Sequence, residues 1–208
     1  MFIVIDGPDG SGKTTLAKCL SKALCSNGIR TIYTSEPTLN SKTGNKIQRV
    51  LKNKESIATQ DLTELFLEDR KEHLINVVQP HLYSGTWVVC DRYKYSALAY
   101  QQVQGLDAKY LIEQHQQCLV PDIIFILIPS SVSVLLDRIK ERGKKKDLFE
   151  NEEMLERVIY YYKNTKKYFP DENIRYLNAD VSTKENLKLV GRCLGVSKLL
   201  NDEDDGII

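Results

Sequence analysis

The stretch Gly7-Pro8-Asp9-Gly10-Ser11-Gly12-Lys13-Thr14 decides the fold of this chain. It fits G-x-x-x-x-G-K-[ST], the pattern of a loop that binds the phosphates of a nucleotide. Its glycines let the backbone curve so that successive N–H groups point at phosphate oxygens, and the helix expected from Lys13 adds the positive end of its dipole. We expect this loop and Thr15 to bind a nucleoside triphosphate, with Lys13 at its β- and γ-phosphates and the Thr14 hydroxyl at Mg²⁺.

The residues on both sides of the loop give it the context that this chemistry needs. An apolar run over residues 2–5 ends at Asp6, which predicts a buried strand leading into the loop. From Lys13 to Asn27, apolar residues recur at the spacing of one helix face, and Gly28 is a stop signal. The sequence thus predicts strand, loop and helix in that order.

The rest of the chain repeats the alternation of short apolar runs and helical patterns. Further strands are expected at 31–34, 86–90, 122–128 and 173–177, and helices at 59–83, 132–142 and 152–168, with a break or bend at Pro80. Strands that are apolar on consecutive residues suit a parallel sheet covered on both faces. We predict an α/β P-loop NTPase fold: one domain over 1–208 with a doubly wound, five-stranded parallel sheet flanked by helices, ending in a frayed acidic tail at 201–208.

Composition excludes several classes of protein. Lys plus Arg number 29 and Asp plus Glu 28, so the formal net charge of +1 gives no reason to expect a nucleic-acid polymer or a membrane as partner. The five cysteines lack the spacing of a zinc site or a disulfide framework. With no secretory signal and no apolar stretch near the ~20 residues of a membrane span, we expect a soluble, cytoplasmic protein.

A phosphate-binding loop leaves three classes open: a GTPase switch, a mechanochemical ATPase and a small-molecule kinase. The fragment nearest to a guanine-reading Asn-Lys-x-Asp is Asn53-Lys54-Glu55-Ser56, which lacks the aspartate and lies too early in the chain. The strand before Asp91-Arg92 does not end in the Asp-Glu pair expected of a motor ATPase. A small-molecule kinase fits best.

Four further segments, in order and at about the expected spacing, make the chain resemble the thymidylate kinase family. They are Ser35-Glu36-Pro37-Thr38, residues 65–70 (Leu-Phe-Leu-Glu-Asp-Arg), Asp91-Arg92-Tyr93 with Ser96 and Tyr100-Gln101, and residues 138–143 (Arg-Ile-Lys-Glu-Arg-Gly). The resemblance runs from Phe2 to about Tyr168. It implies Mg²⁺-assisted transfer of a phosphoryl group from ATP to dTMP, with both substrates small molecules, by an enzyme that commonly forms homodimers.

The helix predicted over 59–83 carries the candidate base contacts. Phe66 and Arg70 are four residues apart, so they share one helix face. In the family these positions stack on the pyrimidine and hydrogen-bond its carbonyl. The alternative is a core phenylalanine beside a solvated arginine.

The candidate phosphate contacts follow the third predicted strand. The resemblance assigns Arg92 to the acceptor phosphate, which suits a planar guanidinium fork, and Asp91 to Mg²⁺ and its waters. Arg49 matches a further acceptor-phosphate ligand. Arg92 with Asp91 could instead be an ion pair that closes the strand, and Arg49 a solvated arginine.

The resemblance places the remaining acceptor contacts around the sugar and base. Asp9 stands where the family has a carboxylate near the 3′-hydroxyl, and Tyr100 where an aromatic ring disfavours a 2′-hydroxyl. Ser96 and Gln101 complete the contacts, and Glu36 also belongs to this site. Ser96, Tyr100 and Gln101 could equally be ordinary helix packing or surface residues.

The segment at about 138–152 is the candidate lid. Some family members place a catalytic arginine in the loop after the acidic residue, but here Gly10 follows Asp9, so the lid must supply this charge. We therefore expect Arg142, and secondarily Arg138, to act at ATP and in catalysis together with Lys13, Arg92 and Asp9. A run of cations that ends a helix can also be a solvated surface.

One departure from the family pattern affects the second motif. Many bacterial members read Arg-Glu-Pro-Gly-Gly-Thr where this chain reads Ser35-Glu36-Pro37-Thr38, so the local geometry there is open. Two other functions stay open as well: a kinase of another monophosphate such as dUMP or CMP, and a P-loop regulatory protein with little turnover.

Overall fold

A computed structural model describes residues 1–52, 54–141 and 151–196. Its sheet has five strands, all parallel, in the order β2-β3-β1-β4-β5. The strands are β1 Phe2–Asp6, β2 Thr31–Ser35, β3 Trp87–Asp91, β4 Ile123–Ile128 and β5 Ile174–Asn178. The predicted α/β class, strand number and parallel pairing are confirmed.

Helices connect successive strands, and one more helix follows the last strand. They are α1 Lys13–Ser26, α2 Lys42–Leu51, α3 Thr59–His73, the π-helical η1 Leu74–Val78, α4 Gln79–Tyr83, α5 Lys94–Val103, α6 Ala108–Gln114, α7 Val132–Glu141, α8 Glu152–Lys163, α9 Thr165–Tyr168 and α10 Thr183–Leu194. In the part of the chain described, no helix has both the length and the apolar character needed to cross a membrane.

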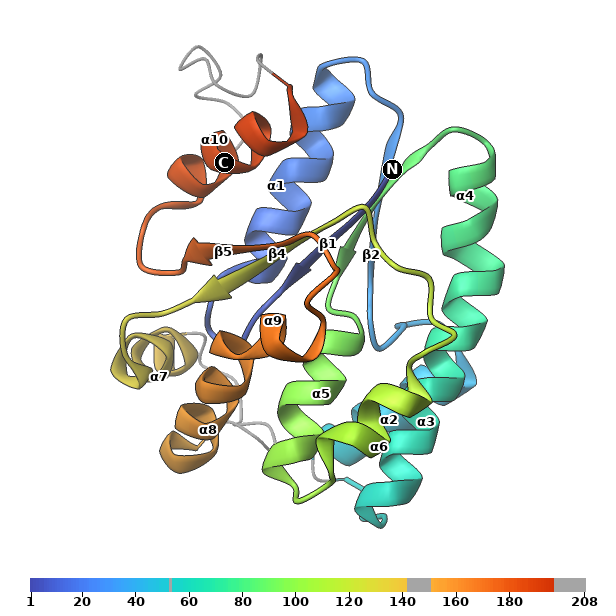
Figure 1. Cartoon of the computed structure of the whole chain (residues 1–208), viewed down its shortest axis with the longest axis vertical. Helices are drawn as coiled ribbons and strands as arrows, with labels where there is room; N and C mark the ends of the chain where they lie inside the picture. The colour runs from blue at the N-terminus through green and yellow to red at the C-terminus, as the bar shows by residue number, and fades with distance from the viewer. Residues whose placement is uncertain (53, 142–150, 197–208) are drawn as a thin grey trace.

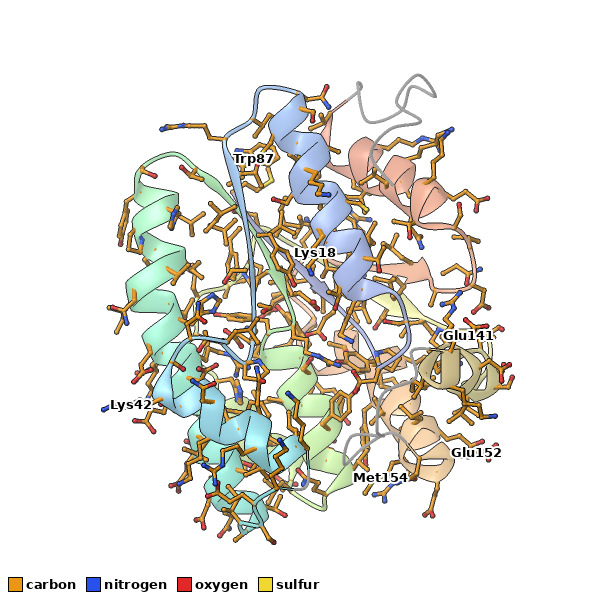
Figure 2. The ribbon with its side chains drawn as sticks, turned by 180° about the vertical axis from the view of Figure 1, so that it is seen from behind. Lys18, Lys42, Trp87, Glu141, Glu152 and Met154 are labelled. Carbon is orange, nitrogen blue, oxygen red and sulfur yellow. The ribbon has the colours of Figure 1, made fainter. Side chains whose placement is uncertain are left out.

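The sheet separates two hydrophobic layers because successive strand residues face opposite sides. Ile3, Ile5 and Phe125 face a layer closed by α1 and α10, while Val4 and Ile126 face a layer closed by η1, α5 and α8. Figure 1 shows α1 and α10 together on one side of the sheet. Figure 2, from behind, shows α1 in front of the strands, with Lys18 halfway along it. Burial on both faces explains the continuous apolar runs of the inner strands.

Two predicted helices differ in detail from those observed. The helix expected over 59–83 is continuous through Pro80, and its irregularity is the wider π segment Leu74–Val78 just before it. A proline lacks an N–H and crowds the carbonyl four residues earlier, so a wider turn there accommodates the ring without breaking the helix. The helix expected over 152–168 ends at Lys163, and the short α9 follows Asn164.

Parallel strands bring their carboxyl ends to one edge of the sheet. The phosphate loop after β1, Glu36 after β2 and Arg92 after β3 therefore meet there, although they are far apart in the sequence. Open parallel sheets bind ligands at this edge.

Candidate active site

The phosphate loop is the turn between β1 and α1. Gly7 and Gly10 have φ of 147° and 85°, and a Cβ atom would lie 2.8 Å from the carbonyl oxygen of Leu127 at Gly7 and 2.9 Å from that of Leu135 at Gly10. Only glycine fits both positions without strain. The cap residue of α1, Gly12, has no side chain that could bond the first N–H groups of the helix. These donors suit phosphate oxygens.

Lys13 and Asp9 bring opposite charges to the loop. The Lys13 ammonium is buried and lies 3.4 Å from both the Pro8 carbonyl oxygen and Asp9 Oδ1. Burial and the nearby Arg92 lower the pKa of Lys13, while Asp9 opposes that shift. Burial alone would raise the pKa of Asp9, but Arg92 and Lys13 hold it well below its usual range. The loop therefore presents an ionised carboxylate among cations.

Arg92 joins the loop to the segment after β3. Its Nη2 forms an ion pair with Asp9 Oδ1, its Nη1 donates to Ser96 Oγ at 2.9 Å, and its guanidinium lies 5.2 Å from the ring centre of Tyr100. The Tyr100 hydroxyl in turn donates to Asp9 Oδ2 at 2.7 Å. Burial alone would lower the pKa of Arg92, but Asp9 raises it well above its usual range. Arg92 is thus a permanent cation at the boundary of the loop.

Asp6, which the sequence interpretation passed over, holds this boundary in place. Its buried carboxylate accepts N–H bonds from Gly7 at 2.8 Å and from Tyr93 and Ser96 at 3.1 Å each. The hydroxyls of Ser96 and Tyr162 also donate to it, at 2.6 and 2.8 Å. Burial raises the pKa of Asp6, and the Arg92 charge opposes the shift. The sequence did contain a signal for Asp6, because an acidic residue at the end of an otherwise apolar strand is unusual.

Thr14 and Asp91 form the candidate Mg²⁺ site. Thr14 Oγ1 donates to Asp91 Oδ2 at 2.5 Å, and the Tyr33 hydroxyl lies 3.3 Å from the same oxygen. Asp91 Oδ1 is buried without a hydrogen-bond partner among the described residues. A hydroxyl and a carboxylate are oxygen ligands of the kind that Mg²⁺ prefers. The two predicted residues are therefore adjacent and fit the ion.

A cavity beside the loop gathers most of the predicted acceptor residues. The cavity has a volume of about 160 Å³. Its lining includes every predicted acceptor residue except Arg49, namely Asp9, Glu36, Phe66, Arg70, Arg92, Ser96, Tyr100 and Gln101. Asp9 belongs to the loop and to the cavity at once, so a donor and an acceptor nucleotide would meet at this residue.

Three side chains in the cavity lining have buried polar atoms without a hydrogen-bond partner in the described structure. The atoms are Arg70 Nη1, both amide atoms of Gln101 and the Gln104 amide oxygen. A buried polar atom without a partner is costly, so such atoms at a cavity wall point to a ligand with complementary donors and acceptors. Phe66 lines the same cavity and supplies an aromatic face.

Glu36 supports Arg70 from behind the cavity. Its Oε2 accepts from Arg70 Nε at 2.7 Å, and its Oε1 lies 3.1 Å from His73 Nδ1. Glu36, His73 and Cys90 offer ligand atoms within 4.8 Å of one another. A metal ion there would meet the Arg70 cation, and burial raises the pKa of the Cys90 thiol well above its usual range. Both facts disfavour a metal centre, so we read the group as a hydrogen-bonded support.

The remaining predicted residues are placed differently. Arg49 lies outside the cavity, with its side chain 66% exposed and its Nε 3.3 Å from Glu55 Oε2. Arg138 Nη1 donates to the Ala179 carbonyl at 2.8 Å and lies 3.5 Å from that of Gly10. Arg138 therefore ties the phosphate loop to the segment after β5. Arg142, most of the proposed lid and the tail at 201–208 lie outside the described residues.

Comparison with known proteins identifies the family. The model of the family described as thymidylate kinase matches residues 5–190. The chain belongs to the thymidylate kinase family. It is 34% identical to a thymidylate kinase of Brachyspira hyodysenteriae over 95% of this chain and 93% of that one. It is also 37% identical to a probable thymidylate kinase of Methanococcus aeolicus, over 89% and 91% of the two chains.

The match to the family covers the residues of the cavity. A probable thymidylate kinase of Methanocaldococcus jannaschii is 39% identical over 76% of this chain and 77% of its own. The match of the family model begins within β1 and ends within α10, so it includes the phosphate loop and the whole cavity lining.

Proposed function

We propose that this chain transfers the γ-phosphoryl group of ATP to the phosphate of dTMP, giving dTDP and ADP. The observation that carries the proposal is the shared residue Asp9, which places the cavity directly against the phosphate loop. Family membership supports the same reaction. We propose that the whole chain acts as one kinase domain.

In the proposed complex the base of dTMP lies between Phe66 and α5. Phe66 stacks on the ring, and Arg70 Nη1 donates to a base carbonyl. Gln101 offers both a donor and an acceptor to the remaining edge, which matches a thymine N–H beside a carbonyl. The buried polar atoms of Arg70 and Gln101 would then have hydrogen-bond partners.

The acceptor phosphate takes Arg92 as its main ligand. The phosphate contacts the guanidinium fork of Arg92, and the Asp9 carboxylate turns toward the sugar. One phosphate oxygen attacks the γ-phosphorus while the bond to the β–γ bridging oxygen breaks, and that oxygen leaves with ADP. No nucleophilic side chain is needed, because the acceptor phosphate is already an anion at neutral pH. The protein contributes position and positive charge.

The loop and β3 serve the donor side. Lys13 binds the β- and γ-phosphates, and backbone N–H groups at the start of α1 bind their oxygens. Thr14 and Asp91 would hold Mg²⁺. When bound, the ion neutralises charge on the phosphate oxygens and helps to align them.

Arg142 stays our prediction for the arginine that stabilises the transferring group. The loop has Gly10 at the alternative position, and Arg138 already bonds two backbone carbonyls. We expect Arg142→Ala to lower kcat by about 100-fold or more with ATP binding nearly intact. Steady-state kinetics and an ATP titration check this. An unchanged kcat would remove Arg142 from the mechanism.

An acceptor panel tests the proposal. With ATP and Mg²⁺, dTMP should give the highest kcat/KM among dTMP, dUMP, dCMP, CMP and thymidine. A higher value for any other acceptor would assign the chain to that substrate. Tight ATP binding without turnover of any acceptor would favour the regulatory alternative. The homodimer and the cytoplasmic location stay predictions.

A further inference from the structure

A buried chain of polar groups runs from β2 to the acceptor cavity. Thr34 Oγ1 lies 2.7 Å from His73 Nε2, His73 Nδ1 lies 3.1 Å from Glu36 Oε1, and Glu36 Oε2 lies 2.7 Å from Arg70 Nε. The side chains of Glu36, Arg70 and His73 are all at most 4% exposed. At the end of the chain Arg70 Nη1 reaches the cavity wall without a hydrogen-bond partner in the described structure.

The direction of these hydrogen bonds follows from the groups themselves. An ionised Glu36 only accepts, so His73 Nδ1 must be the donor in that contact. In a neutral ring His73 Nε2 is then the acceptor, and the Thr34 hydroxyl donates to it. This assignment satisfies every contact and leaves the Glu36–Arg70 pair electrically balanced. A protonated ring would add an uncompensated buried charge.

His73 fixes an orientation that Arg70 alone could not keep. Arg70 touches Glu36 through Nε and lies over the Tyr93 ring, 5.1 Å from its centre. These contacts set the guanidinium plane only if the Glu36 carboxylate cannot rotate. The Glu36 main chain is held by its N–H bond to the Asp91 carbonyl at 3.0 Å, but one carboxylate oxygen would be unbound without His73.

We propose that His73 is a positioning residue for base recognition: through Glu36 it aligns Arg70 so that Nη1 meets a carbonyl of the acceptor base. This inference rests on the proposed function, because it concerns the same cavity. In dCMP an amino group replaces that carbonyl. Both the amino group and Arg70 Nη1 are hydrogen-bond donors, so they cannot pair and dCMP is rejected. His73 therefore sets the preference for dTMP over dCMP without touching either nucleotide.

Two matched variants test this role. His73→Leu removes the donor to Glu36, whereas His73→Asn keeps an amide donor near the place of Nδ1, and both lose the Thr34 contact. We expect His73→Leu to raise the KM for dTMP about 10-fold or more, with the KM for ATP unchanged and the dTMP/dCMP ratio of kcat/KM about 10-fold lower. His73→Asn should keep most of that ratio.

A purely structural role would give a different result. Loss of folded enzyme would lower kcat equally for both acceptors and leave the ratio of kcat/KM unchanged in both variants, which would overturn the proposal. ¹⁵N NMR of the unsubstituted protein adds a second check: a proton on His73 Nε2 rather than Nδ1 would contradict the relay. The acceptor panel on the unsubstituted enzyme tests the proposed function separately.

Discussion

At the scale of single residues, Arg92 is the part of the site with an unfavourable backbone conformation. Its φ of 72° is the one positive value outside glycine in the described residues. Such a conformation costs roughly 1–2 kcal/mol for an L-residue and persists only where its surroundings enforce it. The Arg92 N–H donates to the Ile5 carbonyl at 3.0 Å, and the next N–H, of Tyr93, donates to Asp6. The strained turn aims the guanidinium at the phosphate loop.

Phe66 provides a residue-scale test of base stacking. We expect Phe66→Ala to raise the KM for dTMP about 10-fold or more, because an aromatic stack and its buried area are lost. The KM for ATP should not change, since Phe66 lines the acceptor cavity. Steady-state kinetics with each substrate varied measures both. Leu65→Ala is the matched control, because Leu65 packs in the same hydrophobic cluster on the same helix but does not line the cavity.

Thr14 provides a residue-scale test of the metal site. Thr14→Val removes the hydroxyl that bonds Asp91, whereas Thr14→Ser keeps a hydroxyl at the same position. We expect the valine variant to need about 10-fold more Mg²⁺ for half-maximal activity, and the serine variant to stay close to the unsubstituted enzyme. A magnesium titration at saturating substrates measures this. Equal magnesium requirements in the two variants would exclude the hydroxyl as a ligand.

The sequence predicted the residues of the site better than their partners. Helical spacing put Phe66 and Arg70 on one face, and both line the cavity. The pairing of Glu36 with both Arg70 and His73 was missed, although His73 lies one helical turn after Arg70. Spacing within a helix gives neighbours on that helix only. The contact with Glu36 depends on how α3 packs against the end of β2, which no local pattern contains.

At the scale of elements, the phosphate loop depends on α7 as well as on the helix that follows it. A Cβ atom at Gly10 would lie 2.9 Å from the carbonyl oxygen of Leu135, within α7. Arg138, on the same helix, approaches the Gly10 carbonyl at 3.5 Å and bonds that of Ala179. The helix that leads to the proposed lid therefore sets the conformation of the loop.

Two glycine variants separate backbone strain from this packing. Gly10 and Gly28 have similar φ, 85° and 78°, but a Cβ atom at Gly28 would meet nothing within 4 Å. Gly28→Ala should cost about 1 kcal/mol in the free energy of unfolding, from strain alone. Gly10→Ala should cost about 1–3 kcal/mol more, from the clash with α7, and should weaken ATP binding. Urea denaturation and ATP titration measure these effects. Equal losses of stability would contradict packing of the loop on α7.

Some elements could be predicted from the local sequence, whereas others depend on packing between elements. The inner strands β1, β3 and β4 were predictable because buried parallel strands are apolar on consecutive residues. The π segment before Pro80 was not, since the sequence signals an irregularity but not whether the helix widens or breaks. The short α5 was missed because its buried residues cover both of its sides rather than one stripe.

At the scale of the whole molecule, the sheet order brings the two substrates together. β1 lies between β3 and β4, so the phosphate loop that follows β1 has Arg92 and Asp91 on one side and the segment after β4 on the other. α3 and α5 lie below the sheet in the view of Figure 1. Side chains of both helices line the acceptor cavity. The topology, and not any single motif, makes Asp9 common to both sites.

The burial of His115 predicts that the folded protein loses stability in acid. This residue follows α6, is 3% exposed and donates from Nδ1 to the Leu111 carbonyl at 2.6 Å. Burial, and next the charge of Arg70, lower its pKa to about 3. An unfolded histidine has a pKa of about 6.5, so between pH 6.5 and 3 the unfolded state binds the proton and the native state does not.

Acidification therefore favours the unfolded chain in that window. His115 should contribute a loss of about 1.4 kcal/mol in the free energy of unfolding for each pH unit below 6.5. His115→Asn keeps an amide donor near Nδ1 but cannot take up the proton. The variant should be less stable at pH 7.5 and lose the difference as the pH falls toward 4.5. Urea denaturation of both proteins across this range measures the gap between them. A gap that stays constant would mean that His115 takes up its proton as readily in the folded as in the unfolded protein, so that its site near Arg70 accepts a second positive charge.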